Sequence, residues 1–518
     1  MLGACLLAAA CAGGPAPSAA PPPAAPAART PRAAFRAAVD SILADPQWAT
    51  AQWGVLVVDP QAGDTLYSRN AGKLFLPASN QKLITGAVAL ARLGPDYRWR
   101  TVLAAAGRPG PGGVLAGSVY VFGAGDPTVS DAMQPGGALA PLRAAVDSLW
   151  AHGVRRVAGD VVAVAGGAQG RFPEGPWKFG WEWDDLDTPS GAGVTELLFN
   201  EGVARVTVYG GPRAGAPARV VVRPTPGAVP LDTDSENLRT VAPGDTGAGR
   251  LLAAWDYDAG RYVLRAAVAA GDSATLALGI RDPRRAYADA LALALRARGI
   301  PVGGSAVTKG TALGQYPAGG TSVARGDDPG DRLDTLAVLT SAPLRAVLPA
   351  MEKPSQNQIA EALFLTLGRE GTGVGSGDSA RRVVGDQLRA WGVEPERDAV
   401  VRDGSGLSRH DYVTPAALVR VLDAARRLPD FPLFYDALPV AGVDGTLGNR
   451  LRGTAAAGRV HAKTGSVDRV RNTSGYATAA DGTLLVFSLL CNNYSTPSAE
   501  VTRAEDAIVA RLAALRLR

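Results

Sequence analysis

The sequence predicts an α+β fold in which a sheet flanked by helices is built from both ends of the chain, around a long β-rich insertion. Helical and extended patterns precede residue 106, short strands with many Gly and Pro turns fill residues 107–335, and longer helices followed by apolar strands come after residue 336. We therefore expect one discontinuous domain, residues 33–106 and 336–518. The inserted region, residues 107–335, is expected to contain two domains.

The composition is that of a globular protein with enough apolar material for more than one core. Of the 518 residues, 47% are hydrophobic and 19% are charged, and the net charge is only +5. No run of basic residues with interleaved aromatic residues occurs, so we expect no nucleic-acid partner. The three histidines and three cysteines lack the spacing of zinc ligands, which argues against a zinc peptidase.

The first 32 residues have the composition of an export segment followed by a spacer. Residues 1–14 are apolar and end in small residues, and residues 15–32 are rich in Ala and Pro. Cys11 follows Leu-Ala-Ala-Ala, as in an acylated lipoprotein, although Ala8 stands where leucine is usual and no positive n-region precedes it. We expect export to the periplasm or cell envelope, and leave open a lipid tether at Cys11 or an imprecisely assigned start codon.

The first part of the discontinuous domain predicts a helix, a hairpin and a second helix. Residues 32–46 carry apolar positions at helical spacing, and the strands GVLVVD and TLYSRN are joined by the turn PQAGD. The segment from Ser79 to Gly94 is apolar on one face, and a serine suits the start of a helix. The first turn of this helix is expected to contain both Ser79 and Lys82.

The rest of the chain predicts further helices and a final group of strands. Helices are expected at residues 284–299, 345–352, 356–369, 378–392, 414–427 and 499–516. Strands are expected around K-T-G and in TSGYATAADGTLLVFSLL. Cys491 ends an apolar run, so we interpret it as a buried strand residue and not as a nucleophile.

Lysine is scarce, which makes each lysine informative. Of 53 basic residues only six are lysines: Lys73, Lys82, Lys178, Lys309, Lys353 and Lys463. An amine can lose its proton at an accessible cost, whereas a guanidinium cannot. Ser79-Asn80-Gln81-Lys82 is an S-x-x-K tetrad, in which residues i and i+3 share a helix face, so a neutral Lys82 can take the proton of Ser79. A capped helix with a surface lysine is the alternative.

Two further motifs follow in the chain. Lys463-Thr464-Gly465 lies on an expected edge strand, where Lys and Thr can bind a carboxylate while Gly leaves room for a substrate backbone. S-x-N occurs at Ser68, Ser235 and Ser355, and we choose Ser355-Gln356-Asn357 because it lies between the other motifs and immediately before a predicted helix. Lys73, Lys178 and Lys309 are expected to be solvated, and Lys353 could orient the motif at Ser355.

S-x-x-K, S-x-N and K-T-G in this order are the signature of the penicillin-binding and serine β-lactamase superfamily. The interval from Ser79 to Ser355 is more than twice the interval from Ser355 to Lys463. The chain therefore resembles the penicillin-binding protein 4 type of D-alanyl-D-alanine carboxypeptidase/endopeptidase, the class C low-molecular-mass penicillin-binding proteins, in which two domains are inserted between the first two motifs. The likeness extends through GSVYVFGAGDPT, GWEWDD, DGSGLSRHDYVTP and LPVAGVDGTL. S-Q-N replaces the usual S-D-N.

The resemblance implies an exported serine peptidase that acts on peptidoglycan stem peptides, is acylated by β-lactams and needs no metal or cofactor. It implies that Ser79 is the nucleophile and Lys82 its base, and that Ser355 relays a proton. Asn357 would hold the substrate amide and Lys82, and Lys463 with Thr464 would bind the terminal carboxylate. The backbone N–H groups of Ser79 and Ser466, beside Gly465, would form the oxyanion hole.

Several alternatives stay open at this point. Asp185 and Arg409 are implied to recognise the stem peptide, but a turn residue and a structural ion pair explain them equally well. The absence of an aromatic residue at 186–190 leaves the substrate preference open. The same site could serve a β-lactamase or an esterase, and a non-catalytic peptidoglycan-binding lipoprotein could retain the fold. G-x-S-x-G is absent, which disfavours an α/β-hydrolase.

Overall fold

The computed structural model describes residue 1 and residues 30–166, 172–234, 237–310, 322–325 and 328–518. The expected export segment, most of the spacer and Cys11 lie outside the described residues. Within the described part, no helix is long and apolar enough to cross a membrane.

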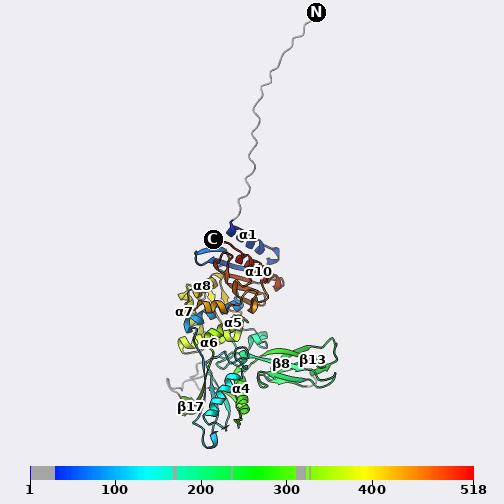
Figure 1. Ribbon diagram of the computed structural model, residues 1–518, viewed down its shortest axis with the longest axis vertical. Helices are drawn as coiled ribbons and strands as arrows, with labels where there is room; N and C mark the ends of the chain where they lie inside the picture. Colours follow the sequence, from blue (N-terminus) through cyan, green and yellow to red (C-terminus); the bar gives the residue numbers. More distant parts are fainter. Residues whose placement is uncertain (2–29, 167–171, 235–236, 311–321, 326–327) are drawn as a thin grey trace.

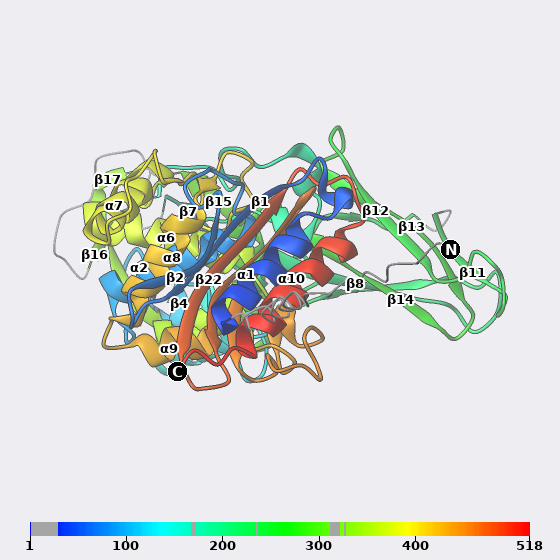
Figure 2. The ribbon, with the colours of Figure 1, turned by 90° about the horizontal axis from the view of Figure 1, so that it is seen from above.

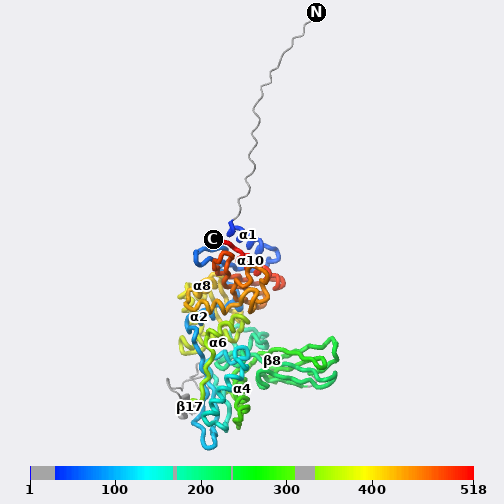
Figure 3. Tube along the Cα trace, in the orientation of Figure 1, coloured from blue at the N-terminus to red at the C-terminus, as the bar shows by residue number. Residues whose placement is uncertain are grey.

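A five-stranded antiparallel sheet joins the two ends of the chain. Its strand order is β2-β1-β22-β21-β20. Helices α1 (Pro31–Leu43) and α10 (Ser498–Ala513), which come from opposite ends of the chain, lie close together in Figure 3. The strands are β1 (Gln52–Asp59), β2 (Asp64–Arg69), β20 (Val460–Val467), β21 (Val470–Thr478) and β22 (Leu484–Asn492). The expected α+β fold is confirmed, and β20, which carries the K-T-G motif, is an edge strand as predicted.

Both faces of this sheet are covered, which requires strands that are apolar on both sides. Along β22, Phe487 and Cys491 pack in the core that includes α1 and α10, whereas Val486 and Leu490 pack in the core formed by the helices of the other face. Figure 2 shows α1 and α10 lying side by side over the sheet. Cys491 is a buried free thiol, as predicted.

The helices that cover the sheet agree with the predictions to within a few residues. They are α1 (Pro31–Leu43), α2 (Gln81–Leu93), α5 (Leu344–Glu352), α6 (Asn357–Thr372), α7 (Gly377–Ala390), α8 (Pro415–Arg426), α9 (Phe431–Ala437) and α10 (Ser498–Ala513). The short helix α9 is not among the predicted ones. The two-residue strands β18 (Ala399–Val400) and β19 (Tyr412–Val413) pair beside the helices.

The inserted region contains a mixed six-stranded sheet with the order β15-β7-β5-β3-β17-β16. Its strands are β3 (Arg100–Ala105), β5 (Val119–Phe122), β7 (Val161–Ala165), β15 (Ala306–Gly310), β16 (Ser322–Arg325) and β17 (Asp328–Thr340). Strands β3 and β17 pair with each other and extend beyond the expected limits of 107 and 335. The inserted sheet therefore begins before, and ends after, the sequence-derived boundaries.

Two helices pack against this part of the chain. They are α4 (Pro283–Ala297), which was expected, and α3 (Ala140–Ala151), which was not. The apolar positions Leu142, Val146 and Leu149 of α3 are buried in one cluster, and Gly and Pro residues before them obscure the helical spacing in the sequence.

The rest of the insertion projects to one side as a β-rich arm, visible beside β8 and β13 in Figure 1. Its two sheets have the orders β10-β13-β11, with β12 also paired to β13, and β14-β8-β9. The strands are β8 (Val203–Tyr209), β9 (Arg219–Arg223), β10 (Leu231–Asp232), β11 (Leu238–Val241), β12 (Arg250–Asp256), β13 (Arg261–Ala269) and β14 (Ser273–Gly279). A short parallel pair, β4 (Val114–Leu115) and β6 (Arg156–Val157), lies elsewhere in the insertion.

Candidate active site

The sequence predicted Ser79 in the first turn of the α-helix, but the structure places it in a tight turn just before that helix. The turn is the 3-10 helix η2 (Ala78–Asn80), which leads directly into α2, and Ser79 caps no backbone group there. Ala78 has φ +46°, a left-handed conformation that is uncommon for alanine. Ser79 is partly exposed at the cleft, whereas Lys82, on the first turn of α2, is buried.

The Lys82 amine has three oxygen neighbours. Its Nζ lies 2.9 Å from Ser79 Oγ, and it donates to Asn357 Oδ1 at 2.6 Å and to the Ser405 carbonyl at 2.8 Å. Burial, together with the positive charge of Lys463, lowers the pKa of Lys82 to about 7. A neutral amine has two N–H groups and one lone pair, so with two fixed acceptors the lone pair is left for the Ser79 hydroxyl.

The second motif lies between α5 and α6. Ser355 has φ +65° and lines the cleft, and Asn357 is the first residue of α6. The Asn357 amide also donates to the Ser190 carbonyl at 3.0 Å, so it connects Lys82 to a loop of the insertion. Gln356, where the family usually has Asp, caps α6 by accepting from the Gln358 N–H. The alternative motif at 235–237 lies partly outside the described residues.

The third motif forms the wall opposite Ser355. Lys463 is fully buried, and its Nζ donates to the Thr464 carbonyl at 2.9 Å. The Thr464 hydroxyl donates to Thr446 Oγ1 at 2.7 Å. A Cβ atom on Gly465 would lie 2.6 Å from the Pro77 carbonyl, so only glycine lets β20 approach the nucleophile turn this closely.

One cleft of about 660 Å³ brings the three motifs together. Of the predicted residues, Ser79, Ser355, Asn357, Thr464, Gly465 and Ser466 line this cleft. Lys82 and Lys463 lie behind its wall as buried side chains. Residues that the sequence did not single out also line it: Ser190, Glu201, Thr446, Arg450 and Arg471. No short motif marks these positions, because they come together only in the folded chain.

A buried carboxylate layer supports Lys82 from behind. The Glu361 carboxylate accepts from the N–H groups of Gly404 at 3.0 Å and Ser405 at 2.8 Å. Asp403 accepts from the N–H of Gly406 at 2.6 Å, which fixes the same loop. The loop therefore presents the Ser405 carbonyl to Lys82. In the sequence, D-G-S-G was noted only within a stretch that resembles the family, and this role was not predicted from it.

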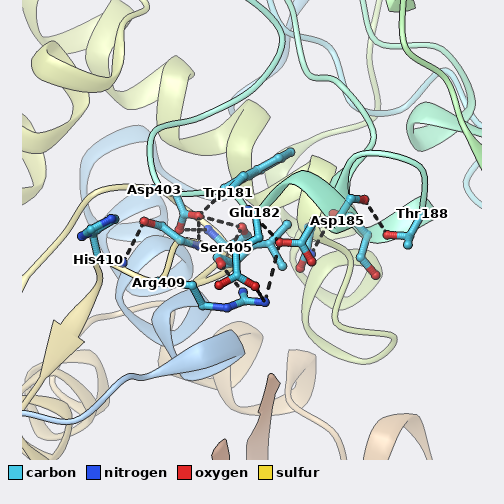
Figure 4. A network of polar contacts seen from close by, with 12 residues as sticks. Trp181, Glu182, Asp185, Thr188, Asp403, Ser405, Arg409 and His410 are labelled. Carbon is cyan, nitrogen blue, oxygen red and sulfur yellow. Dashed lines mark hydrogen bonds and ion pairs between the residues drawn. The ribbon is translucent and has the colours of Figure 1, made fainter. Parts of the chain in front are cut away.

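Asp185 and Arg409 meet, but as part of a larger ion-pair network. Arg409 lies 3.7 Å from Asp185 Oδ2 and donates to Glu182 Oε2 at 2.9 Å, as Figure 4 shows. Trp181 of the same loop donates to Asp403 Oδ2 at 2.9 Å. Partial burial raises the pKa of Asp185. The network joins the insertion to the loop that presents Ser405, and Glu182 is the partner that the sequence did not reveal.

Two of the remaining lysines, Lys178 and Lys353, form ion pairs with carboxylates. Lys178 was expected to be solvated but is buried, with its Nζ 3.7 Å from Glu174 Oε2. Lys353 donates to Asp444 Oδ2 at 2.7 Å and to the Leu438 carbonyl at 3.0 Å. Lys353 therefore ties the segment before Ser355 to the loop beside β20, consistent with the orienting role considered from the sequence.

Comparison with known proteins identifies the family. The family model for the D-Ala-D-Ala carboxypeptidase 3 (S13) family matches residues 35–515. The chain belongs to this family. It is therefore an enzyme, a serine-type D-Ala-D-Ala carboxypeptidase, as the sequence predicted.

Comparison with individual proteins supports the same family assignment. The D-alanyl-D-alanine carboxypeptidase of Actinomadura sp. (strain R39) is 34% identical, over 92% of this chain and 84% of that protein. The carboxypeptidase DacB of Haemophilus influenzae is 27% identical, over 83% of each chain. The crystal structure of penicillin-binding protein 4 from the same organism superposes with a TM-score of 0.72 and 23% identity, covering 92% of this chain and 99% of that one. The expected penicillin-binding protein 4 type is confirmed.

Proposed function

We propose that Ser79 attacks the carbonyl between the two terminal D-alanines and that Lys82 takes its proton. The observation that carries this proposal is the 2.9 Å contact between Lys82 Nζ and Ser79 Oγ on a fully buried amine. The product of the step is an acyl-enzyme on Ser79. Two acceptors, Asn357 and Ser405, hold the amine in place for this transfer.

We further propose roles for the opposite side of the cleft. Lys463 and Thr464 bind the terminal carboxylate, and the backbone N–H groups of Ser79 and Ser466 stabilise the oxyanion. Gly465 leaves room for the substrate backbone. Ser355 returns the proton to the leaving amine, for which its position on the cleft wall gives support.

The substrate assignment follows from the family activity. Stem peptides of peptidoglycan end in D-Ala-D-Ala, and a solved relative, penicillin-binding protein 4 of Haemophilus influenzae, has been determined in complex with a β-lactam. We propose that β-lactams acylate Ser79 in this chain as well. Arg450 and Arg471 line the cleft together with Thr464, and its volume of about 660 Å³ supports a leaving group larger than D-alanine, and with it D,D-endopeptidase activity as a second activity.

We also propose how the stem peptide is recognised and where the protein acts. Asp185 and Arg409 recognise the stem peptide through the loop that contacts Asn357. The protein acts in the cell envelope, on the periplasmic side, where its substrate lies. Leu-Ala-Ala-Ala before Cys11 supports a lipid tether at this cysteine, and an imprecisely assigned start codon is the alternative. The insertion between β3 and β17 consists of two domains, for which the six-stranded sheet and the projecting arm give support.

Labelling with fluorescent penicillin tests the central step. The parent should form a covalent adduct, and Ser79→Ala should form none while keeping the parent's melting temperature. A folded parent without an adduct would overturn the proposal. Release of D-alanine and cleavage of cross-linked dimers, measured on defined muropeptides, separate carboxypeptidase from endopeptidase activity. Rapid loss of the penicillin adduct would instead indicate a β-lactamase.

A further inference from the structure

A further ionisable side chain is buried behind the cleft and has no role in the mechanism proposed above. Glu352, the last residue of α5, is 0% exposed, and among the residues that the structure describes neither of its carboxylate oxygens has a hydrogen-bond partner. A buried carboxylate without donors is costly to keep charged. The C-terminal end of a helix also disfavours a negative charge. The charged form of Glu352 is therefore energetically unfavourable at this site, and its charge state depends on the charges around it.

Gly86 places this carboxyl beside the catalytic lysine. A Cβ on Gly86 would lie 2.8 Å from Glu352 Oε1, so α2 leaves a gap that the carboxyl fills. Gly86 is four residues after Lys82, one turn further along the same face of α2. The next nearest atoms to this position are apolar, Met351 Cε and Phe434 Cε2. The carboxyl thus lies beside apolar side chains, opposite a position of α2 one turn after Lys82.

The charged groups that act on Glu352 come from two elements. They are Lys463 of β20, which has the larger effect, and Lys82 of α2. Helix α6 contributes Glu361, which acts on Lys82 from the side of Ser405, and α9 contributes the apolar Phe434. Burial raises the pKa of Glu352 to about 7, and the two lysines oppose the rise. Its proton is therefore poised to move when another charge enters the cleft.

The reaction makes opposite demands on the two lysines. Lys82 must be neutral to accept the Ser79 proton, whereas Lys463 must be charged to bind a carboxylate. A negative Glu352 raises the pKa of Lys463 and so keeps that amine charged in the free enzyme. A bound substrate carboxylate then supplies the same negative charge from the other side. Two anions beside one buried ammonium group repel each other, so one of them is expected to take a proton.

We propose that Glu352 is a positioning residue that takes up one proton from solvent when the substrate carboxylate binds at Lys463, and releases it when the product leaves. The carboxylate becomes a carboxylic acid by forming one O–H bond to a proton from solvent, no other covalent bond changes, and the Lys463 charge is neutralised by one anion in each state. The inference rests on the proposed roles of Lys82 and Lys463. It adds a third group to the ionisation of the site.

Calorimetry with benzylpenicillin tests the proton uptake. Opening of the β-lactam moves the Ser79 proton to the ring nitrogen, so acylation itself takes none from solvent. Titrations near pH 7, in buffers that differ in ionisation enthalpy, report protons taken up per adduct. A guanidinium stays charged, so the Lys463→Arg background keeps residue 463 from taking up the proton itself. The parent and Lys463→Arg should each take up a measurable fraction of a proton, and Lys463→Arg combined with Glu352→Gln close to none. Asp126→Asn is the matched control, since Asp126 is a buried carboxyl with a raised pKa in the insertion, and it should retain the parent's uptake.

The pH profile of acylation supplies a second readout. Loss of the Glu352 charge lowers the pKa of both lysines, so both limbs of the profile should move to lower pH by about one unit. A merely structural role would reduce the rate at every pH and leave both limbs in place. Glu352→Met fills the same pocket with an apolar side chain and should give the same shifts if Glu352→Gln fails to fold.

The outcomes separate this inference from the function it rests on. A parent that forms the adduct without proton uptake, or a folded Glu352 variant with the parent's uptake and profile, overturns the role of Glu352. A folded parent that forms no adduct overturns the proposed function instead.

Discussion

Lys82 and Lys463 are equally buried beside one cleft, but their surroundings differ. Each side chain is 0% exposed. Lys82 Nζ has three oxygen neighbours, from Ser79, Asn357 and Ser405, whereas the contact described for Lys463 Nζ is with the Thr464 carbonyl. Burial lowers the pKa of both amines, to about 7 for Lys82 and about 8 for Lys463.

The comparison teaches that burial alone does not assign a role to a lysine. Two fixed acceptors and one hydroxyl suit a neutral amine that removes a proton. An amine with a single backbone acceptor has N–H groups left for an incoming anion, and a nearby carboxyl, Glu352, favours its charged form. The predictions below test this division of labour between the two lysines.

The largest effect is expected from removal of Lys82. Lys82→Ala should reduce the acylation rate by about 10²- to 10⁴-fold, the usual contribution of a general base. Lys73→Ala is the control, because Lys73 is an exposed lysine nine residues before Lys82 in the sequence. Stopped-flow measurement of penicillin acylation checks both. Acylation by Lys82→Ala at the parent's rate would assign the base to another group.

A smaller and more selective loss is expected from Lys463. Lys463→Ala should lower kcat/KM for a D-Ala-D-Ala peptide by about 10- to 100-fold, since hydrogen bonds to a charged group contribute about 1.5–3 kcal/mol. The parent should prefer this peptide over its C-terminal amide, and the variant should lose the preference. If both enzymes discriminate equally, the carboxylate binds elsewhere.

The pH profile of activity should have an acid limb caused by Lys82 and an alkaline limb caused by Lys463. Activity should rise as pH passes about 7, because Lys82 loses its proton, and fall above about 8, because Lys463 loses its charge. A kcat/KM profile on a D-Ala-D-Ala peptide checks this. Lys463→Arg should abolish the alkaline limb while keeping the acid limb, since a guanidinium stays charged. If the alkaline limb of the Lys463→Arg profile is unchanged, a group other than Lys463 causes that limb.

The smallest effect is expected at the distant end of the substrate. Arg409→Ala should reduce kcat/KM on a complete stem peptide by at most about tenfold, the lower range for a charged hydrogen bond. Hydrolysis of a truncated D-Ala-D-Ala substrate should be unaffected, because that substrate lacks the part of the stem peptide that Arg409 is proposed to recognise. Arg397→Ala removes an exposed ion pair with Asp398 and serves as the control. Equal losses on both substrates would indicate that Arg409 only orders the Ser405 loop.

Much of the site could be predicted because its motifs are local. Ser79 and Lys82 are three residues apart, and Lys463, Thr464 and Gly465 are consecutive, so helix and strand geometry alone places their side chains. Lysine scarcity made these motifs conspicuous. The junctions of the insertion were less accessible, because β3 and β17 pair across more than 200 residues of chain, a contact that no local pattern announces.

Sequence alone therefore determined the fold class and the order of the motifs, and it named the residues for which catalytic roles are proposed. Tertiary structure decided the charge states of those residues, because desolvation and hydrogen bonding depend on segments that meet only on folding. The carbonyl of Ser405 and the amide of Asn357 contact Lys82 from different elements, and the buried carboxyl of Glu352 acts on both lysines through its charge. A lysine in a sequence is a charge, whereas a lysine in this cleft is an acid or a base according to what surrounds it.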